Sequence, residues 1–363
     1  MPELYIGLMS GTSHDGVDAV LAAAGRGRVR LIKAHHLAYS PSLRTRLLAL
    51  QEPGPDEMHR AAILANELSD LYARAVRRLL ARAGVGARAV AAIGCHGQTV
   101  RHRPGDGYTL QLINGARLAE RSGIAVVCDF RSRDVAAGGE GAPLVPAFHR
   151  AMFGTARRSR VVVNVGGIAN LTLLPARDAV TGFDCGPGVC LLDAWIREKR
   201  RKPFDVSGAW AASGRVIPPL LMKLLAHPFF RRRPPKSTGR DEFDLRWVKR
   251  ALAGSEKAAD VQATLLELTA VTIARAVRRH CAGVHEVFVC GGGARNRALL
   301  ARLSALLPGA RVATTDALGI KPEHVEALAF AWLARQAFHN KPGNLPAVTG
   351  ARGPRVLGAI YPR

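Results

Sequence analysis

Short apolar runs separated by glycine-rich turns open the chain. Residues 5–9, 17–21 and 29–34 form such runs, and SGTSHDG (residues 10–16) and GRG (residues 25–27) separate them. Apolar runs that are bounded by turn residues are typical of β-strands. The first 34 residues therefore predict a three-stranded meander.

Helical spacing follows the meander. Residues 43–50 and 58–83 carry it, and the longer stretch places one apolar stripe at Ile63, Leu64, Leu68, Leu71, Ala75, Leu79 and Leu80. Gly84 is a suitable helix stop, because glycine adopts the left-handed conformation common after a last turn. Short strands are predicted at 90–93 and 125–128, with a helix at 115–122 between them.

The second half of the chain restarts in the same way. A strand at 161–165, a glycine turn at 166–170 and a strand at 171–174 are followed by helical patterns at 191–199, 218–225, 259–280 and 298–307, with a strand at 287–290. We therefore predict two related α/β domains. Their expected bounds are 1–130 and 131–363, with a last helix at about 322–338.

Charge is the unusual feature of the composition. Lys and Arg total 52 against 28 Asp and Glu, a formal net charge of +24, and this excess is spread along the chain. Such a field attracts anions such as nucleotides, phosphosugars or nucleic acid. Aromatic residues make up 6% and are not interleaved with the basic clusters, unlike a platform that stacks single-stranded bases. Charge alone leaves these partners open.

The cysteines and the apolar runs exclude other classes. The six cysteines have no C-x-x-C spacing and lie mostly in strand-like stretches, so neither a zinc site nor a disulfide framework is expected. No apolar run reaches the roughly 20 residues that span a bilayer. The chain also opens without a basic segment typical of a signal peptide. We expect a cytoplasmic protein without membrane contact.

Glycine turns carry the candidate chemistry. The P-loop, zinc-protease and G-x-S-x-G signatures are absent. In the first turn, glycines allow close approach of a ligand to the backbone, whose N–H groups can hold phosphate oxygens. The residues concerned are Gly11, Thr12, Ser13, His14, Asp15, Gly16, Val17 and Asp18. Asp15 or Asp18 can hold Mg²⁺ directly or through water. The same residues also suit an ordinary hairpin turn.

Three further turns extend this pattern. Gly166 and Gly167 also fit a plain turn, whereas Gly291, Gly292, Gly293 and Asn296 follow a strand and open a helix, where a nucleotide can lie. Asp184 precedes the rigid Gly186-Pro187-Gly188 bend. A carboxylate at such a strand end is placed to act as a general base, or alternatively to cap the following helix.

Taken together, these segments resemble the anhydro-N-acetylmuramic acid kinase family, within the sugar kinase, Hsp70 and actin superfamily. The matching segments, in chain order, are 9–18 (MSGTSHDGVD), 95–102 (CHGQTVRH), 129–146 (DFRSRDVAAGGEGAPLVP), 164–171 (NVGGIANL), 183–195 (FDCGPGVCLLDAW), 235–243 (PKSTGRDEF), 291–296 (GGGARN) and 318–334 (LGIKPEHVEALAFAWLA). The resemblance implies two RNase H-like domains with a nucleotide cleft between them. The sequence departs from the family at His14, where Leu is usual, and at Val189, where Asn is usual.

The resemblance also implies a reaction. ATP with Mg²⁺ phosphorylates O6 of 1,6-anhydro-N-acetylmuramic acid while water opens the anhydro bridge, giving N-acetylmuramate 6-phosphate and ADP in cell-wall recycling. Asp184 would be the base, and Glu326 would assist at the metal or the sugar or be a first-turn acid that the helix dipole favours. The sugar would be bound by Arg131 at its lactyl carboxylate, and by Gln98, Thr99 and Asp134. A homodimer is implied as well.

Two alternatives stay open. A related kinase for a different sugar would share the nucleotide turns and differ at residues 95–102, 129–146 and 235–238. A basic nucleic-acid-binding protein with an idle kinase site is the other. Its affinity would fall steeply with salt. The acids Asp15, Asp18 and Asp184 argue against it, because they repel phosphates unless a metal intervenes.

Overall fold

The computed structural model describes residues 2–11, 14–25, 27–177, 179–239, 242–281 and 283–363. The chain divides into two compact units, one of residues 1–152 with 324–363 and the other of residues 153–323. This division differs from the expected boundary at 130/131. The segment up to residue 152 belongs to the first unit. The end of the chain also belongs to it, because the last long helix, residues 325–338, packs on the first sheet.

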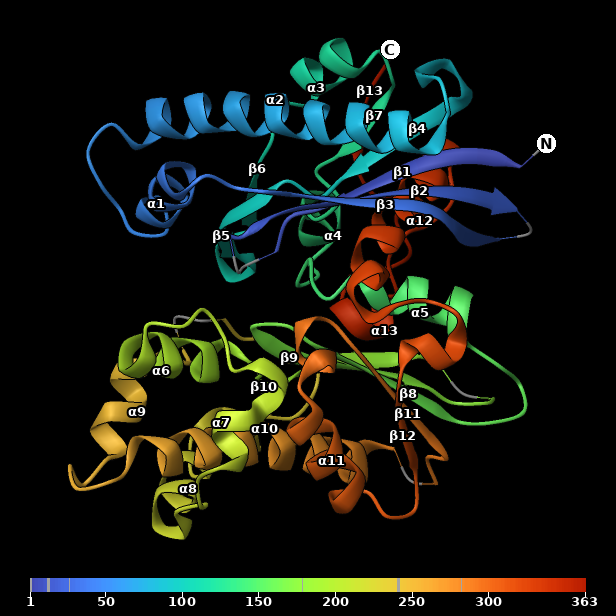
Figure 1. The fold of residues 1–363 in the computed structure, drawn as a ribbon. Coiled ribbons are helices and arrows are strands. Elements are labelled where there is room, and N and C mark those ends of the chain that lie inside the picture. The colour runs from blue at the N-terminus through green and yellow to red at the C-terminus, as the bar shows by residue number, and fades with distance from the viewer. Residues whose placement is uncertain (1, 12–13, 26, 178, 240–241, 282) are drawn as a thin grey trace. The chain divides into compact units, whose positions relative to one another are not determined.

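The first unit is built on a mixed β-sheet (Figure 1). Its strand order is β13-β7-β4-β1-β2-β3, with bounds Ala359–Tyr361, Val126–Cys128, Val90–Cys95, Glu3–Met9, Gly16–Gly25 and Arg28–Ala38. The predicted meander is confirmed, since β2 pairs antiparallel with both β1 and β3. β4 joins β1 in parallel, and β7 joins β4 in parallel. A separate hairpin of β5 (Gln98–Arg103) and β6 (Tyr108–Leu112) was not predicted, because its residues are largely polar.

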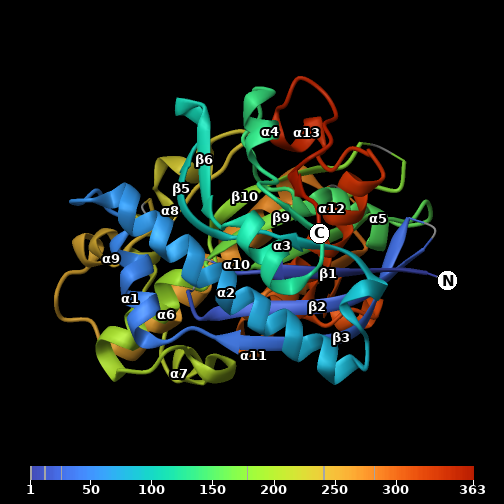
Figure 2. The same ribbon diagram turned by 90° about the horizontal axis from the view of Figure 1, so that it is seen from above.

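Helices cover both faces of this sheet (Figures 1 and 2). Ile6 and Leu8 of β1 share a buried core with the stripe of α2, whereas Gly7 between them faces α12 so closely that a Cβ there would lie 1.8 Å from the carbonyl oxygen of Ala327. Gly84 ends α2 in the left-handed conformation, as predicted. The helices of the unit are α1 (Pro41–Ala49), α2 (Glu57–Ala83), α3 (Gly115–Ser122), α4 (Ser132–Ala136), α5 (Val145–Phe153), α12 (Val325–Phe338) and α13 (Pro346–Thr349).

The second unit repeats the topology of the first. Its strand order is β10-β9-β8-β11-β12, with bounds Thr181–Pro187, Ile168–Leu174, Arg160–Val165, Glu286–Cys290 and Arg311–Thr314. β9 is antiparallel to β8 and β10, and β11 is parallel to β8 and β12. A three-stranded meander that continues into parallel strands beside its first strand is the RNase H-like arrangement. The repetition confirms the prediction of two related α/β domains.

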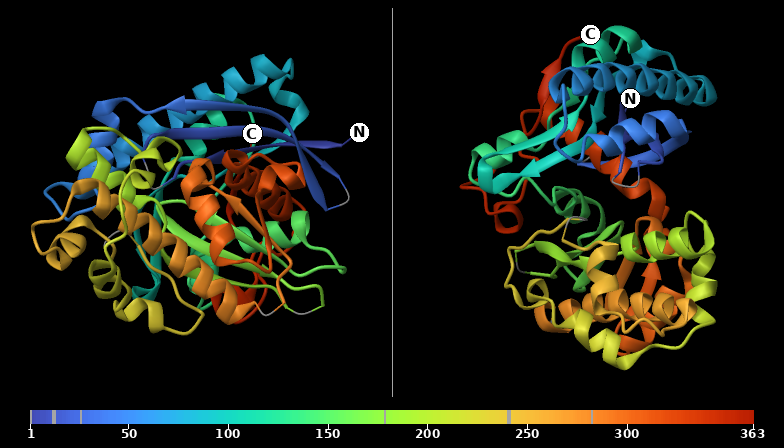
Figure 3. Two further views of the ribbon diagram at one scale, coloured as in Figure 1. Left: turned by 60° about the horizontal axis from the view of Figure 1, so that its bottom comes forward. Right: turned by 90° about the vertical axis from the view of Figure 1, so that its left-hand side faces the viewer.

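Helices α10 and α11 lie along one face of the second sheet (Figures 1 and 3). Alternate residues of β8, namely Val161, Val163 and Val165, share a buried core with Leu268 and Ile273 of α10. The helices of this unit are α6 (Cys190–Arg200), α7 (Ala209–Ala212), α8 (Pro218–Leu225), α9 (Leu245–Ala251), α10 (Ala258–His280) and α11 (Arg297–Leu306). In the part of the chain that the structure describes, no helix is long and apolar enough to span a bilayer.

Candidate active site

The first glycine turn connects β1 to β2. The N–H of His14 donates to the carbonyl of Gly11 (3.3 Å), and His14 adopts a left-handed φ of 53° with its side chain buried. The departure at position 14 therefore places an imidazole inside the turn. Thr12 and Ser13, predicted as phosphate donors, lie outside the described residues. Gly16 and Val17 already belong to β2 and are buried.

The side chain of Gln98 supports this turn through hydrogen bonds. It is fully buried, its Nε2 donates to the carbonyl of Gly11 (3.2 Å), and its Oε1 accepts a hydrogen bond from the hydroxyl of Ser10. The Ser10 hydroxyl also bonds the phenol of Tyr39. Both ends of the Gln98 amide are thus used within the protein. The family resemblance implies a sugar contact for Gln98, and in the structure its amide bonds support the turn.

The two acids proposed for Mg²⁺ have different surroundings. Asp15 is exposed at the end of the turn, where its carbonyl accepts from the N–H of Tyr39. Asp18 lies farther along β2, and its Oδ1 is 2.9 Å from Nδ1 of His36. This carboxylate raises the pKa of His36. Among the described residues no group of three or more metal-ligating side chains is assembled. The carboxylate of Asp15, exposed at the turn, is of the oxygen-ligand type that holds Mg²⁺ directly or through water.

Asp184 lies in β10, beside a register shift that separates it from Gly186. Its neighbours Phe183 and Cys185 are buried, while Asp184 itself is half-buried. Its N–H donates to the carbonyl of Lys236 (3.1 Å), and its Oδ2 accepts from the N–H of Thr238 (3.0 Å). Asp184 does not cap α6, since the residue at the N-cap is Val189. Its carboxylate is thus positioned by the loop after α8.

Backbone hydrogen bonds join two glycine motifs of the second unit, residues 166–167 and 186–188. The N–H groups of Gly188, Val189 and Cys190 donate to the carbonyls of Gly166 and Gly167 at 2.9–3.2 Å. A Cβ on Gly188 would lie 2.2 Å from the carbonyl oxygen of Gly166. Val189 is the second departure from the family pattern. Its N–H donates to the carbonyl of Gly166, a backbone bond that does not depend on the side chain. The turn at Gly166 thereby fixes the bend that follows Asp184.

The third turn connects β11 to α11, as predicted. Gly291 has a φ of 77°, and a Cβ on Gly291 or Gly293 would collide with Asn164 or Val165 at the end of the neighbouring strand β8. Gly292 is exposed, and a Cβ there would meet nothing within 4 Å. The side chain of Asn296 caps α11 by accepting from the N–H of Leu299 (3.0 Å). Gly292 and the N-terminus of α11 are therefore the parts open to a ligand.

Arg131 is oriented by a histidine that the sequence analysis missed. Its Nε and Nη2 lie 3.1 and 2.9 Å from Nε2 of His96, and its Nη1 donates to the carbonyl of Gly141 (2.8 Å). Burial and the nearby Arg131 charge lower the pKa of His96 to about 3. His96 is therefore neutral, with Nδ1 donating to the carbonyl of Gly97 (2.9 Å) and Nε2 accepting from Arg131. The sequence signal for His96 was its position in the segment 95–102, two residues before Gln98.

The other predicted sugar contacts lie in different settings. Asp134 is fully buried, and its carboxylate accepts from the N–H of Gly141 (2.9 Å), the amide of Asn344 (2.7 Å) and the hydroxyl of Thr349 (2.8 Å). Through these bonds Asp134 connects residues 131–141 to residues 344–349 near the end of the chain. Thr99 is half-buried beside a register shift in β5.

Glu326 is half-buried in the first turn of α12. The next residue, Ala327, packs its carbonyl against Gly7 of β1. Glu326 therefore lies in the helix that backs β1, the strand that leads into the first turn.

Comparison with known proteins gives a match over nearly the whole chain. The family model described as anhydro-N-acetylmuramic acid kinase matches residues 3–363. A protein of that name from Thiobacillus denitrificans is 56% identical and covers 99% of this chain and 97% of its own length. Its counterpart in Nitrosomonas europaea is 54% identical, with 99% of both chains covered. The Chromobacterium violaceum protein is 53% identical over the full length of both.

Solved structures with a related arrangement are more distant. The activator of 2-hydroxyisocaproyl-CoA dehydratase from Clostridium difficile, with bound ADPNP, has a TM-score of 0.46 at 13% identity and covers 91% of this chain and 94% of its own. A ROK family glucokinase from Streptomyces griseus, in complex with glucose and AMPPNP, has a TM-score of 0.42 at 14% identity, covering 92% and 99%.

Proposed function

Because the chain belongs to the anhydro-N-acetylmuramic acid kinase family, we propose that Asp184 is the base of a ring-opening phosphoryl transfer. The protein is an ATP-dependent kinase of 1,6-anhydro-N-acetylmuramic acid that acts in peptidoglycan recycling. The observation that supports the role of Asp184 is its half-buried carboxylate, held by the N–H of Thr238 at 3.0 Å.

In the anhydro sugar O6 is bonded to C1 and carries no proton, so the C1–O6 bond must break before O6 can be phosphorylated. The chemistry requires a base because the water that attacks C1 must lose a proton. The Asp184 carboxylate takes a proton from water as the water oxygen bonds to C1. The C1–O6 bond breaks, O6 bonds to the γ-phosphorus of ATP, and ADP leaves. The products are N-acetylmuramate 6-phosphate and ADP. Phosphoryl transfer of this kind depends mainly on positioning and charge stabilisation.

The glycine turns suit the nucleotide. The turn of Gly11, His14 and Asp15, which Gln98 supports, holds the β- and γ-phosphates through its backbone. Gly292 and the N-terminus of α11 border the adenosine. When bound, Mg²⁺ neutralises phosphate charge, with Asp15 holding it directly or through water. Asp18 is the less suitable ligand because it already pairs with His36.

The sugar is held by its lactyl carboxylate. Arg131, fixed by His96 and Gly141, presents a guanidinium that suits two parallel bonds to a carboxylate. Thr99 contacts a hydroxyl or the N-acetyl group. Gln98 and Asp134 support this region from the interior. Glu326 assists at the metal or the sugar from the first turn of α12.

Cellular setting and assembly complete the proposal. A recycling reaction that consumes ATP supports a cytoplasmic location. We expect a homodimer, which light scattering coupled to size exclusion tests directly, since a monomer mass at micromolar concentration contradicts it.

A coupled ADP-release assay tests the function. The sugars are 1,6-anhydro-N-acetylmuramic acid, N-acetylmuramic acid and N-acetylglucosamine, each with ATP and Mg²⁺. ADP release that requires the anhydro sugar supports the reaction, and release with another sugar alone contradicts it. The Asp184→Asn variant should lose roughly 10²–10⁴-fold in kcat, the usual contribution of a general base, and should still bind ATP. Near-full turnover by this variant excludes Asp184 as the base.

A further inference from the structure

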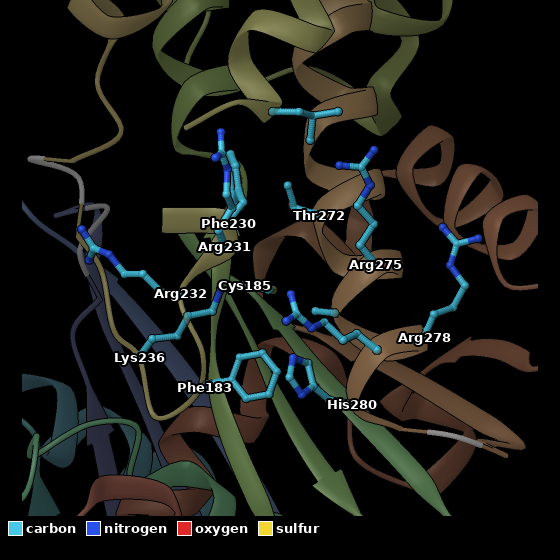
Figure 4. Close-up of a pocket in the computed structure, with 13 residues that line it drawn as sticks. Phe183, Cys185, Phe230, Arg231, Arg232, Lys236, Thr272, Arg275, Arg278 and His280 are labelled. Carbon is cyan, nitrogen blue, oxygen red and sulfur yellow. The ribbon is translucent and has the colours of Figure 1, made fainter. Parts of the chain in front are cut away.

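A basic pocket lies in the second unit, beside Phe183 and Cys185 of β10 (Figure 4). Its cavity volume is about 650 Å³. Cations line it from two segments, the end of α10 and the chain that follows α8. They are Arg231, Arg232, Lys236, Arg275, Arg278 and Arg279.

The concentration of charge exceeds what the composition explains. Lys and Arg are six of the 13 residues that line the pocket, but 52 of 363 in the chain, so composition alone would place about two there. No acidic side chain lines the pocket among the residues that the structure describes. Arg232 is paired with Glu242 (3.1 Å) outside the lining. For Arg275, Arg278 and Arg279 the described part of the chain supplies no ion pair.

Helix stabilisation accounts for only part of this cluster. Arg278, Arg279 and His280 lie in the last turn of α10, where cations favour the helix dipole. Arg275 lies outside that turn, and Lys236 belongs to a different segment whose ammonium donates to the carbonyl of Phe229 (3.2 Å). Burial lowers the pKa of Lys236, Cys185 and Asp184 act in the opposite direction, and the charges of Arg279 and Arg232 also lower it. Like charges are thus held close together, which an anion would relieve.

We propose that this pocket binds a small anion carrying phosphate groups, at a site separate from the glycine turns. Guanidinium groups suit phosphate because they donate paired hydrogen bonds in a fixed plane. Arg275 and Arg279 on α10 hold the phosphate oxygens, with Lys236 as the cation from the opposite side. Phe183 and Phe230 supply apolar parts of the lining. The volume accommodates either a diphosphate or a phosphosugar.

The pocket is connected to Asp184 through the chain itself. Phe183 and Cys185 line the pocket and flank Asp184, and the carbonyl of Lys236 accepts from the N–H of Asp184. An anion that fixes Lys236 therefore also fixes the loop whose Thr238 N–H bonds the Asp184 carboxylate. Occupancy should slow hydrogen exchange at residues 236–239.

Calorimetric titration of the full chain with inorganic pyrophosphate tests the proposal. The protein is kept saturated with the ATP analogue AMPPNP, so that the proposed nucleotide turns are filled. We expect binding of one pyrophosphate per chain. Arg275→Gln combined with Arg279→Gln should weaken it by about 10-fold or more, because two charge-assisted donors are lost. Glucose 6-phosphate replaces pyrophosphate in a second titration, with glucose as the uncharged control, to separate a phosphosugar from a diphosphate.

The matched control is Arg197→Gln combined with Arg215→Gln, two exposed arginines of the same unit outside the pocket. This variant removes the same charge and should bind pyrophosphate as the unmodified chain does. Equal weakening in both double variants would reduce the effect to net charge and overturn the proposal. So would the absence of binding for both phosphate compounds at millimolar concentration, or binding that AMPPNP abolishes. Arg275→Lys with Arg279→Lys should keep part of the affinity, which a folding defect would not restore.

Discussion

The backbone N–H of Thr238 donates a 3.0 Å hydrogen bond to Oδ2 of Asp184, across 54 residues of sequence. A second bond, from the N–H of Asp184 to the carbonyl of Lys236, attaches the same two segments. A donor to a carboxylate favours its charged form and fixes its direction. The loop after α8 therefore determines both where the proposed base points and how readily it accepts a proton.

Removal of that one N–H should impair turnover. Thr238→Pro lacks the donor, so kcat should fall by about 10-fold or more, and the acidic limb of the pH–rate profile should move to higher pH because the Asp184 carboxylate loses a bond that favours its charge. KM for ATP should change little. Thr238→Ala keeps the N–H and loses only the hydroxyl bond to Glu242 (2.6 Å), so it is the matched control. Equal kinetics for the two variants would dismiss the role of the N–H.

Loss of the His96 acceptor should weaken sugar binding. His96→Phe leaves a ring beside Phe330 but removes the Nε2 that accepts from Arg131. A lost hydrogen bond to a charged group costs about 1.5 kcal/mol or more, so KM for the anhydro sugar should rise about 10-fold while KM for ATP stays constant. The exposed His59→Gln is the control histidine. An unchanged sugar KM in His96→Phe would contradict the positioning of Arg131 by His96.

A substitution at Gly292 can distinguish an effect on ATP binding from an effect on stability. A Cβ at Gly292 meets nothing within 4 Å, so Gly292→Ala should melt at the temperature of the unmodified chain. If adenosine lies against this backbone, the added methyl group should raise KM for ATP several-fold. Gly309→Ala, where a Cβ also meets nothing within 4 Å, should leave both quantities unchanged. Gly292→Ala with normal ATP affinity would move the nucleotide away from this turn.

His149 should make the stability depend on pH. Burial lowers its pKa to about 3, so the folded chain keeps it neutral while the unfolded chain protonates it below about pH 6.5. The unfolded state then binds more protons, and the free energy of unfolding falls as the pH drops from 7.5 to 5.0. Urea titrations of His149→Gln should show a fall that is smaller by about 2 kcal/mol. The exposed His59→Gln should leave the pH dependence as it is. An unchanged pH dependence in His149→Gln would show that His149 is protonated equally in both states.

The sequence determined the elements and their repetition. Strong local patterns such as the apolar stripe of residues 63–80 and the glycine turns after β1, β8 and β11 predict structure because they depend on neighbouring residues only. Short or polar strands escaped this reasoning. β5 is formed by pairing with β6, and its own residues carry no alternating signal.

Only the tertiary structure decided what the polar side chains do. Gln98 and Asp134 look like ligand contacts in the sequence, but both are buried and bonded to the protein interior. The role of His96 in orienting Arg131 follows from their contact in the structure. The physical reason is that a polar residue's role depends on which donors and acceptors surround it, and folding brings these from distant segments. Local pattern therefore determined where the chain turns, and long-range contacts decided which turn residues remain open to a ligand.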